Sequence, residues 1–146
     1  MSELRLSIRR GRRTDFTAVM GLLAGAGLAL PPPDRATLRR FRNLVADLGA
    51  DFYLVLVDGA LAGCVHVTYA RQLARLPRAS LDLLVVAEPF RRRGVGSALL
   101  AFAQQRARRR GCAVLCCAVR AVNAHARLFL EKGCLHSEGE CFVQAL

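Results

Sequence analysis

A short stretch near the middle of the chain combines arginine and glycine in a way that suits phosphate binding. It reads RRRGVGS over residues 91–97. Arginine carries a positive charge and planar N–H donors that fit phosphate oxygens. Glycine has no side chain to keep an anion away from the backbone N–H groups. We therefore expect this stretch to bind phosphate, and a pyrophosphate in particular.

The elements expected on either side of this stretch complete an anion site. Residues 81–86 form an apolar run with branched side chains, typical of a buried strand, and Pro89 marks a turn. After Gly96 the apolar residues recur at helical spacing. The first N–H groups of a helix lack partners within it and lie at the positive end of its dipole, so they attract anions. The sequence therefore predicts a phosphate at the start of this helix.

Two well-known phosphate loops do not fit the stretch, and a third does. A P-loop ends in Gly-Lys-Ser/Thr, and the stretch contains no lysine. The dinucleotide fingerprint needs a third glycine where this chain has Leu99. The stretch resembles the acetyl-coenzyme A loop of the GNAT superfamily of N-acetyltransferases, Gln/Arg-x-x-Gly-x-Gly/Ala. Arg91, Gly94 and Gly96 carry that resemblance.

A second GNAT signature follows near the end of the chain, with three departures. Similar proteins carry Asn-x-x-Ala-x-x-aromatic/Leu-Tyr-x-Lys-x-Gly-Phe on a helix. The residues that match it are Asn123, Ala126, Phe129 and Lys132. Leu130 stands at the tyrosine position, Cys134 at the glycine position and Leu135 at the final phenylalanine position.

The missing tyrosine bears on mechanism. In many relatives its hydroxyl protonates the leaving thiolate, which Leu130 cannot do. Either another group or water protonates the thiolate, or its release needs no dedicated acid. The alternative is an inactive member of the family, and the intact phosphate loop argues against that alternative.

The resemblance also implies which residues contact acetyl-coenzyme A. The backbone of Val86 is expected to pair with the pantetheine amides as an added strand would, and its N–H to stabilise the oxyanion. Asn123 either contacts the pantetheine arm or caps its helix. The implied cofactor-binding residues are Leu84, Val85, Val86, Arg91, Arg92, Arg93, Gly94, Val95, Gly96, Ser97, Asn123, Ala126 and Phe129. No metal is implied.

Asp82 is the candidate catalytic residue. An amine with a pKa near ~10 must lose a proton before it attacks an acetyl group. Relatives often place a carboxylate, commonly glutamate, on the central strand for this purpose, and Asp82 lies there in step with Leu84 and Val86. The alternative is an aspartate that only attracts the substrate cation or pairs with an arginine. His66 and Tyr69 fall on opposite faces of the preceding strand and are expected to be half-buried.

Composition limits the other functions. The chain has 146 residues, 53% of them hydrophobic, and we expect one domain over residues 1–146. No apolar run approaches the ~18 residues of a membrane span, and the first residues lack a signal-peptide core, so we expect a cytoplasmic protein without a membrane partner. The net charge is +11, and all but one of the 22 basic residues are arginine. This charge favours a nucleic-acid binder, but no nucleic-acid motif is present, so we attribute it to the surface of an enzyme with a polyanionic cofactor.

The six cysteines form no C-x-x-C pair and show no zinc-site spacing. We expect reduced, mostly buried thiols with no role in catalysis.

Local signals predict the order βααβββαβαβ. They include a first strand around residues 4–8, a helix capped by Thr14, a second helix after the PPPD turn at residues 31–34, and a hairpin at Asp58-Gly59. Gly111 is expected to end the central helix. A strand over residues 113–119, a helix over residues 123–132 and a final strand over residues 141–146 complete the chain.

This order is also that of GNAT domains. The resemblance implies an α/β (α+β) fold: a mixed, twisted, mostly antiparallel sheet, with helices on both faces and a cofactor between two splayed central strands. It implies an N-acetyltransferase that moves acetyl from acetyl-coenzyme A to a primary amine, on a small molecule or a protein, by direct attack in a ternary complex. The alternatives are a non-catalytic acyl-coenzyme A binding domain and a basic nucleic-acid-binding protein. Homodimers are common among similar proteins.

Overall fold

The structure is a computed structural model that describes residues 3–119, 123–139 and 142–146. Its main elements are β1 (Leu6–Arg10), α1 (Phe16–Gly25), α2 (Arg35–Ala46), β2 (Asp51–Val57), β3 (Ala60–Ala70), β4 (Arg78–Val86), α3 (Val95–Arg109), β5 (Val114–Cys116) and α4 (Ala124–Lys132). Two short 3-10 turns, Arg13–Asp15 and Glu88–Phe90, precede α1 and α3.

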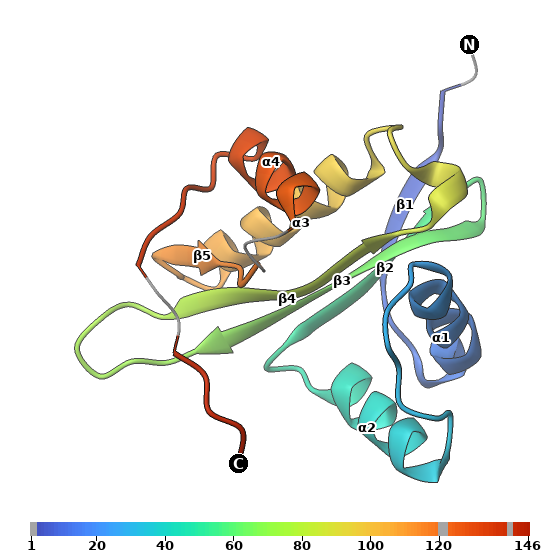
Figure 1. Ribbon diagram of the computed structural model, residues 1–146, viewed down its shortest axis with the longest axis horizontal. Helices are drawn as coiled ribbons and strands as arrows, with labels where there is room; N and C mark the ends of the chain where they lie inside the picture. Colours follow the sequence, from blue (N-terminus) through green and yellow to red (C-terminus); the bar gives the residue numbers. More distant parts are fainter. Residues whose placement is uncertain (1–2, 120–122, 140–141) are drawn as a thin grey trace.

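The five strands form one sheet in the order β1-β2-β3-β4-β5. All neighbours are antiparallel except β4 and β5, which are parallel. Helices α1 and α2 lie on one face of the sheet, and α3 and α4 lie on the other (Figure 1). The predicted mixed sheet with helices on both faces is therefore confirmed.

Each face of the sheet has its own apolar core. Val55, Val65 and Leu99 belong to the cluster between the sheet and α3. Leu54 and Cys64 belong to the cluster between the sheet and the α1/α2 layer. Because both faces are covered, consecutive residues of one strand are both buried, which explains why the inner strands have continuous apolar sequences.

Several local signals act as predicted. Asp58 and Gly59 both have positive φ values, 50° and 83°, as a two-residue hairpin turn between β2 and β3 requires. The Asp34 carboxylate caps α2 by accepting from the Thr37 N–H at 2.9 Å. Gly111 follows α3 with a φ of 73°, the left-handed conformation that ends many helices.

The start of α1 differs from the prediction that Thr14 caps it. Thr14 lies inside the 3-10 turn, and α1 begins after Asp15. The Asp15 carboxylate accepts from the Arg12 N–H at 2.7 Å and from two nitrogens of Arg9 at 2.8 Å each. These contacts hold the turn in place, so Asp15 occupies the position predicted for Thr14.

The end of the chain also differs from the prediction. Residues 142–146 form no strand, and Phe142 and Val143 are each 89% exposed; Cys141 lies outside the described residues. β5 is also shorter than the predicted strand over residues 113–119. Apolar sequence gives a propensity for strand, but a strand forms only where a neighbouring strand supplies its hydrogen bonds.

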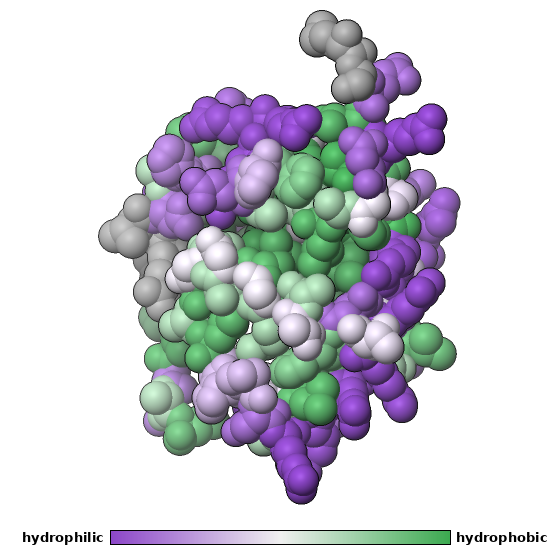
Figure 2. Space-filling view, turned by 90° about the vertical axis from the view of Figure 1, so that its right-hand side faces the viewer, coloured by the Kyte–Doolittle hydropathy of each residue, from purple (hydrophilic) through white to green (hydrophobic). Residues whose placement is uncertain are grey.

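The α1 side of the molecule carries an apolar surface. α1 has no charged residue from Phe16 to Gly25. Figure 2 faces this side and shows an apolar area bordered by hydrophilic side chains. Within the described residues, no helix has the length and apolar character needed to cross a membrane.

Candidate active site

The parallel strands β4 and β5 separate after a short paired segment. Pairing joins only Arg78–Ser80 to Val114–Cys116, while β4 continues to Val86. The separation leaves a cavity of about 700 Å³ between the two strands and α4. Its lining includes Leu28, Leu81, Asp82, Leu83, Leu84, Val85, Cys117, Ala118, Val119, Asn123, Ala126, Phe129 and Leu130. We call this cavity the splayed-strand cleft, and the predicted splay of the two strands is present in the structure.

One face of α4 forms a wall of this cleft. Ala126 follows Asn123 by three residues, and Phe129 and Leu130 follow Ala126 by three and four, so these residues share one side of the helix. The Asn123 carboxamide oxygen accepts from the Ala126 N–H at 3.0 Å, so the predicted helix cap is confirmed. Leu130 faces the cleft, so the position of the missing tyrosine points toward the predicted site of chemistry.

The start of α3 is shaped for an anion. Gly94 precedes the helix with a φ of 81°, a left-handed conformation that glycine adopts without strain. Because Gly94 has no side chain to cap the helix, the N–H groups of Val95, Gly96 and Ser97 have no acceptor among the described residues and are open to a ligand. These N–H groups lie at the positive end of a 15-residue helix.

Gly96 brings this helix start against the cleft. A Cβ atom at Gly96 would lie 3.3 Å from the Phe129 ring and 3.6 Å from the Val86 side chain. The start of α3 therefore packs closely against α4 and the end of β4. Residues 91–97 themselves lie outside the lining of the cleft and adjoin it through this contact.

The three arginines of the loop have different surroundings. The Arg91 Nε donates to the Val86 carbonyl at 3.0 Å. The Arg93 guanidinium lies 6.0 Å from the centre of the Phe90 ring. Arg92 has a φ of 57°, an unusual conformation for a residue with a side chain. All three side chains are exposed.

The backbone groups of Val86 face the unpaired edge of β4. The N–H of the next residue, Ala87, donates to the Ala62 carbonyl on β3 at 2.8 Å. Backbone groups of consecutive strand residues point to opposite sides, so those of Val86 point away from β3. The Arg91 contact to the Val86 carbonyl agrees with this direction.

Asp82 lies at an irregularity of β4. The pairing runs from His66–Leu83 to Val67–Leu81, so Asp82 is an extra residue with no partner on β3. Such a bulge re-aims a side chain. Leu84 and Val86 pack toward α3. Ala79 faces α3, so the next residue, Ser80, lies on the opposite face of the strand. The Ser80 hydroxyl donates to the Asp82 carboxylate, which therefore lies on that opposite face as well. The expectation that Asp82 lies in step with Leu84 and Val86 is therefore wrong, because the bulge breaks the alternation.

Two hydroxyl groups hold the Asp82 carboxylate. The Thr68 hydroxyl donates to Oδ2 at 2.5 Å, and the Ser80 hydroxyl donates to Oδ1 at 2.7 Å. No arginine is within salt-bridge distance of Asp82 in the described residues. Asp82 is exposed and lines the cleft, so its carboxylate is accessible to a substrate.

The structure places His66 and Tyr69 on opposite faces of β3, as predicted. The His66 ring packs on Phe52, with ring centres 5.9 Å apart, on the α1/α2 side. Burial lowers the pKa of His66 below its usual value, against the raising effect of Asp82, so its ring is neutral at pH 7. The Tyr69 hydroxyl donates to Asp51 on β2, away from the cleft lining. Both residues are half-buried, as expected.

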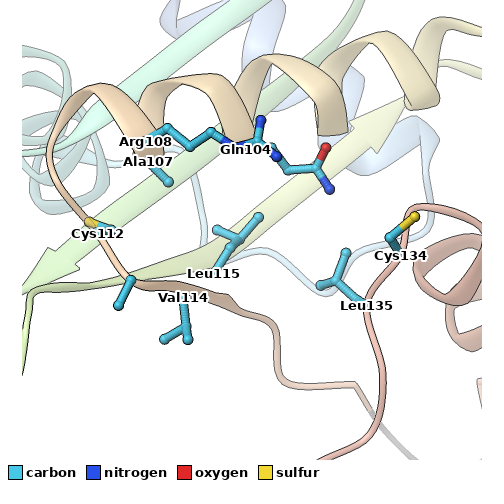
Figure 3. Close-up of a pocket in the computed structure, with 9 residues that line it drawn as sticks. Gln104, Ala107, Arg108, Cys112, Val114, Leu115, Cys134 and Leu135 are labelled. Atoms are coloured by element: carbon cyan, nitrogen blue, oxygen red, sulfur yellow. The ribbon is translucent and has the colours of Figure 1, made fainter.

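A second, smaller pocket of about 200 Å³ lies between α3, β5 and the segment after α4. Figure 3 shows Leu115 pointing toward α3, with Cys112 and Cys134 on opposite sides of the pocket. None of the predicted site residues lines it. The five described cysteines are free thiols. Only Cys64 is fully buried, so the expectation of mostly buried thiols is wrong.

The sequence did not indicate every residue of the site. Thr68 comes to Asp82 through the register of β3 and β4, Leu28 through the loop after α1, and Cys117 through its place directly after β5, and these arrangements are known only from the fold. Ser80 could have been found, because it lies two residues before Asp82 on one strand. Among the described residues, no group of three His, Cys, Asp or Glu side chains could hold a metal ion.

Comparison with solved structures shows how widely this fold is shared. A transcriptional regulator from Bacillus halodurans C-125 superposes with a TM-score of 0.87 and 21% identity, covering 97% of this chain and 100% of the other. Glucosamine-6-phosphate N-acetyltransferase from Arabidopsis thaliana has a TM-score of 0.80 and 17% identity, with 97% and 98% covered. An aminoglycoside N-acetyltransferase in complex with CoA has a TM-score of 0.80 and 19% identity, with 99% and 96% covered.

Sequence comparison gives the family. No curated protein matches the chain. The sequence model described as the acetyltransferase (GNAT) family matches residues 18–134, which include β4, the loop before α3 and all of α4. Members of this family use acetyl-coenzyme A. By this match and by its fold, the chain belongs to the GNAT acetyltransferase family and is an acyltransferase.

Proposed function

We propose that the protein transfers an acetyl group from acetyl-coenzyme A to a primary amine by direct attack within a ternary complex. The splayed-strand cleft carries this proposal, because it brings together residues of β4 and of the second GNAT signature on α4 that the resemblance assigns to the cofactor. In the proposed complex, the pantetheine arm enters between β4 and β5. The pyrophosphate lies on the N–H groups at the start of α3.

The open edge of β4 supports this placement of the pantetheine arm. An extended amide chain pairs with an unpaired strand edge as an added strand does. The Val86 backbone groups point to that edge. The Arg91 side chain already donates to the Val86 carbonyl. Arg91 must therefore share or release this carbonyl when a pantetheine amide donates to it. The Val86 N–H can donate to the oxyanion of the tetrahedral intermediate.

We propose that the Asp82 carboxylate binds the incoming amine. This carboxylate lines the cleft and carries a negative charge opposite an incoming ammonium. It either takes the amine proton directly or through water, or it only binds the cation. The relatives compared include enzymes named for aminoglycosides, glucosamine-6-phosphate and a ribosomal-protein alanine, so acceptors of both small-molecule and protein type belong in the test.

The thiolate that leaves is proposed to take its proton from water. Leu130 lines the cleft where the family tyrosine would be, and its side chain has no proton to give. A thiol has a pKa near ~8.5, so its thiolate leaves without a strong acid.

The proposal is tested by measuring free thiol released from acetyl-coenzyme A over a panel of amines that includes small amines, amino sugars and peptide N-termini. We expect release that depends on the amine and yields the N-acetyl product. Acetyl-coenzyme A binding without release for any amine would instead indicate a binding domain. A cysteine acetylated before amine is added, and able to pass the acetyl group on, would contradict direct transfer.

A further inference from the structure

We infer that Thr68 and Ser80 are positioning residues for the reaction, and that they act by fixing the Asp82 carboxylate at the cleft. This inference rests on the proposed role of Asp82. The hydroxyl groups come from two neighbouring strands, β3 and β4, and each donates to a different carboxylate oxygen.

The bulge creates the need for such positioning. Asp82 has no partner on β3, and the register shift lies directly beside it. It is also exposed, so packing does not fix its rotamer. An exposed carboxylate at an irregular point of a strand can rotate unless hydrogen bonds hold it. Thr68 and Ser80 pair with each other across β3 and β4 on the regular side of the bulge, so their hydroxyls have a defined place.

The hydrogen-bond geometry leaves room for a substrate. A carboxylate has about four acceptor positions, and the two hydroxyls use two of them, one on each oxygen. The remaining positions can accept N–H groups from an ammonium. Each hydroxyl oxygen also keeps acceptor capacity after its hydrogen is donated. The three side chains therefore present one fixed, negatively charged surface to an incoming amine.

The distances agree with this role. Hydroxyl hydrogen bonds to a carboxylate are shorter and stronger than those between neutral groups, typically about 2.5–2.7 Å. The observed lengths are 2.5 Å from Thr68 and 2.7 Å from Ser80. Loss of a hydrogen bond to a charged group, with loss of alignment of the reacting groups, slows reactions by about 10- to 100-fold.

The experiment compares variants that keep or remove each hydroxyl. Thr68→Val keeps the branched shape and removes the hydroxyl, and Thr68→Ser keeps the hydroxyl. Ser80→Ala and Ser80→Thr form the matching pair. With the best amine from the panel, we expect Thr68→Val and Ser80→Ala each to lower kcat/KM for the amine by about 10- to 100-fold. Thr68→Ser and Ser80→Thr should recover most of that loss.

Two further measurements separate positioning from a structural role. The affinity for acetyl-coenzyme A and the thermal midpoint should change little, because valine suits a strand and the cofactor contacts lie elsewhere in the cleft. In an Asp82→Asn background, removing either hydroxyl should have no further effect on kcat/KM, because residues that act as one unit are not additive.

The results distinguish this inference from the role proposed for Asp82. A large loss in Asp82→Asn together with wild-type kcat/KM in both hydroxyl variants would overturn the positioning role and keep Asp82. Additive losses in the Asp82→Asn background would also overturn it. Unchanged activity in Asp82→Asn would overturn both, because Thr68 and Ser80 are proposed to act only through that carboxylate.

Discussion

Asp82 and Leu130 face the same cleft from β4 and α4, and together they frame the two proton transfers of the proposed reaction. The amine must lose a proton, and the departing thiolate must gain one. Asp82 has a carboxylate that can serve the first transfer, whereas Leu130 has no group for the second. Single substitutions at these two positions therefore separate the two transfers.

Asp82→Asn should slow the reaction most at low pH. There the amine arrives charged and needs a base, whereas near its own pKa a larger fraction is already neutral. We expect the rate to fall by about 10² to 10⁴ at low pH, the usual loss for a general base, and the deficit to shrink as pH rises. A pH–rate profile of kcat checks this prediction. A uniform loss at all pH values, expressed in KM, would show that Asp82 only binds the cation.

Leu130→Tyr should raise kcat if thiolate protonation limits the rate, because it returns a hydroxyl to the cleft wall. Leu130→Phe is the matched control, since it adds the ring without the proton donor. Because water is proposed to protonate the thiolate, we expect the three proteins to have equal kcat values and similar affinities for acetyl-coenzyme A. A tyrosine variant that exceeds both wild type and the phenylalanine variant in kcat would show that thiolate protonation limits the rate. Equal kcat values for all three proteins would show that water already protonates the thiolate.

At the scale of elements, two helix ends hold the cleft together. The start of α3 meets α4 at Gly96 and Phe129. The end of α4 meets α3 at Gly133, where an added Cβ atom would lie 2.3 Å from the Leu100 side chain. The Gln104 side chain also donates to the Gly133 carbonyl at 2.9 Å. An added Cβ atom would therefore force a shift at Gly133, whereas at Gly96 it would make a tight contact with the Phe129 ring.

Gly96→Asp should weaken acetyl-coenzyme A binding, because it places a negative charge where the pyrophosphate is proposed to lie. The matched control is Gly96→Ala, which adds only the Cβ atom near Phe129. We expect Gly96→Asp to bind at least about tenfold more weakly than Gly96→Ala, in titrations at fixed ionic strength. Equal affinities of the two folded variants would place the pyrophosphate elsewhere.

Cys134→Gly should stabilise the protein. Cys134 has a φ of 69°, a conformation that favours glycine. It follows α4 in a turn that is closed by hydrogen bonds from Cys134 N–H to Glu131 O and from Leu135 N–H to Leu130 O. We expect a gain of about 1 kcal/mol in the free energy of unfolding, measured in urea with an unchanged slope.

Cys134→Ala controls for loss of the thiol, because alanine keeps the strained conformation. A gain equal to that of Cys134→Gly would show that backbone strain is not the cause.

Across the whole molecule, the sequence predicted the helices, strands and turns that depend on residues close together in the chain. Helix periodicity, the Asp58-Gly59 turn and the glycines beside α3 are local signals, and each led to the right element. The splay of β4 and β5 followed from resemblance to a family. The bulge at Asp82 did not follow from the sequence, because it arises from pairing between β3 and β4.

Contacts between distant parts of the chain also account for the missed partners of Asp82 and the misplaced final strand. Thr68 lies 14 residues before Asp82, and only the register of two strands brings their side chains together. Residues 142–146 have apolar residues suited to a strand, but strand formation depends on a partner edge that lies far away in sequence.

Asp51 links β2 to β1, β3 and the end of α3. Its carboxylate, 1% exposed at the start of β2, accepts hydrogen bonds from Arg106 of α3, from Arg110 directly after α3 and from Tyr69 of β3. Arg10 of β1 lies 3.6 Å away. Burial raises the pKa of Asp51, but the hydrogen bonds from Arg106, Tyr69 and Arg110 outweigh burial and lower the pKa to about 2. The arginines at the end of α3 thus attach this helix to the sheet through Asp51.

Asp51→Asn should therefore destabilise the fold in a manner that depends on pH. At pH 7 the substitution leaves the half-buried guanidinium groups of Arg106 and Arg110 without their counter-charge, which costs on the order of 3 kcal/mol. Because the pKa of Asp51 is lower in the folded protein than in the unfolded chain, its contribution is complete above about pH 5 and is lost as pH falls toward 2. The difference in free energy of unfolding between wild type and Asp51→Asn should shrink by about 2 kcal/mol between pH 5 and pH 2, and by about 1 kcal/mol of that at pH 3. Urea unfolding at pH 7, 5, 4 and 3 measures it, with the exposed hairpin residue Asp58 changed to Asn as the matched control. A difference that stays constant from pH 7 to pH 3 would show that the carboxylate charge does not hold these elements together.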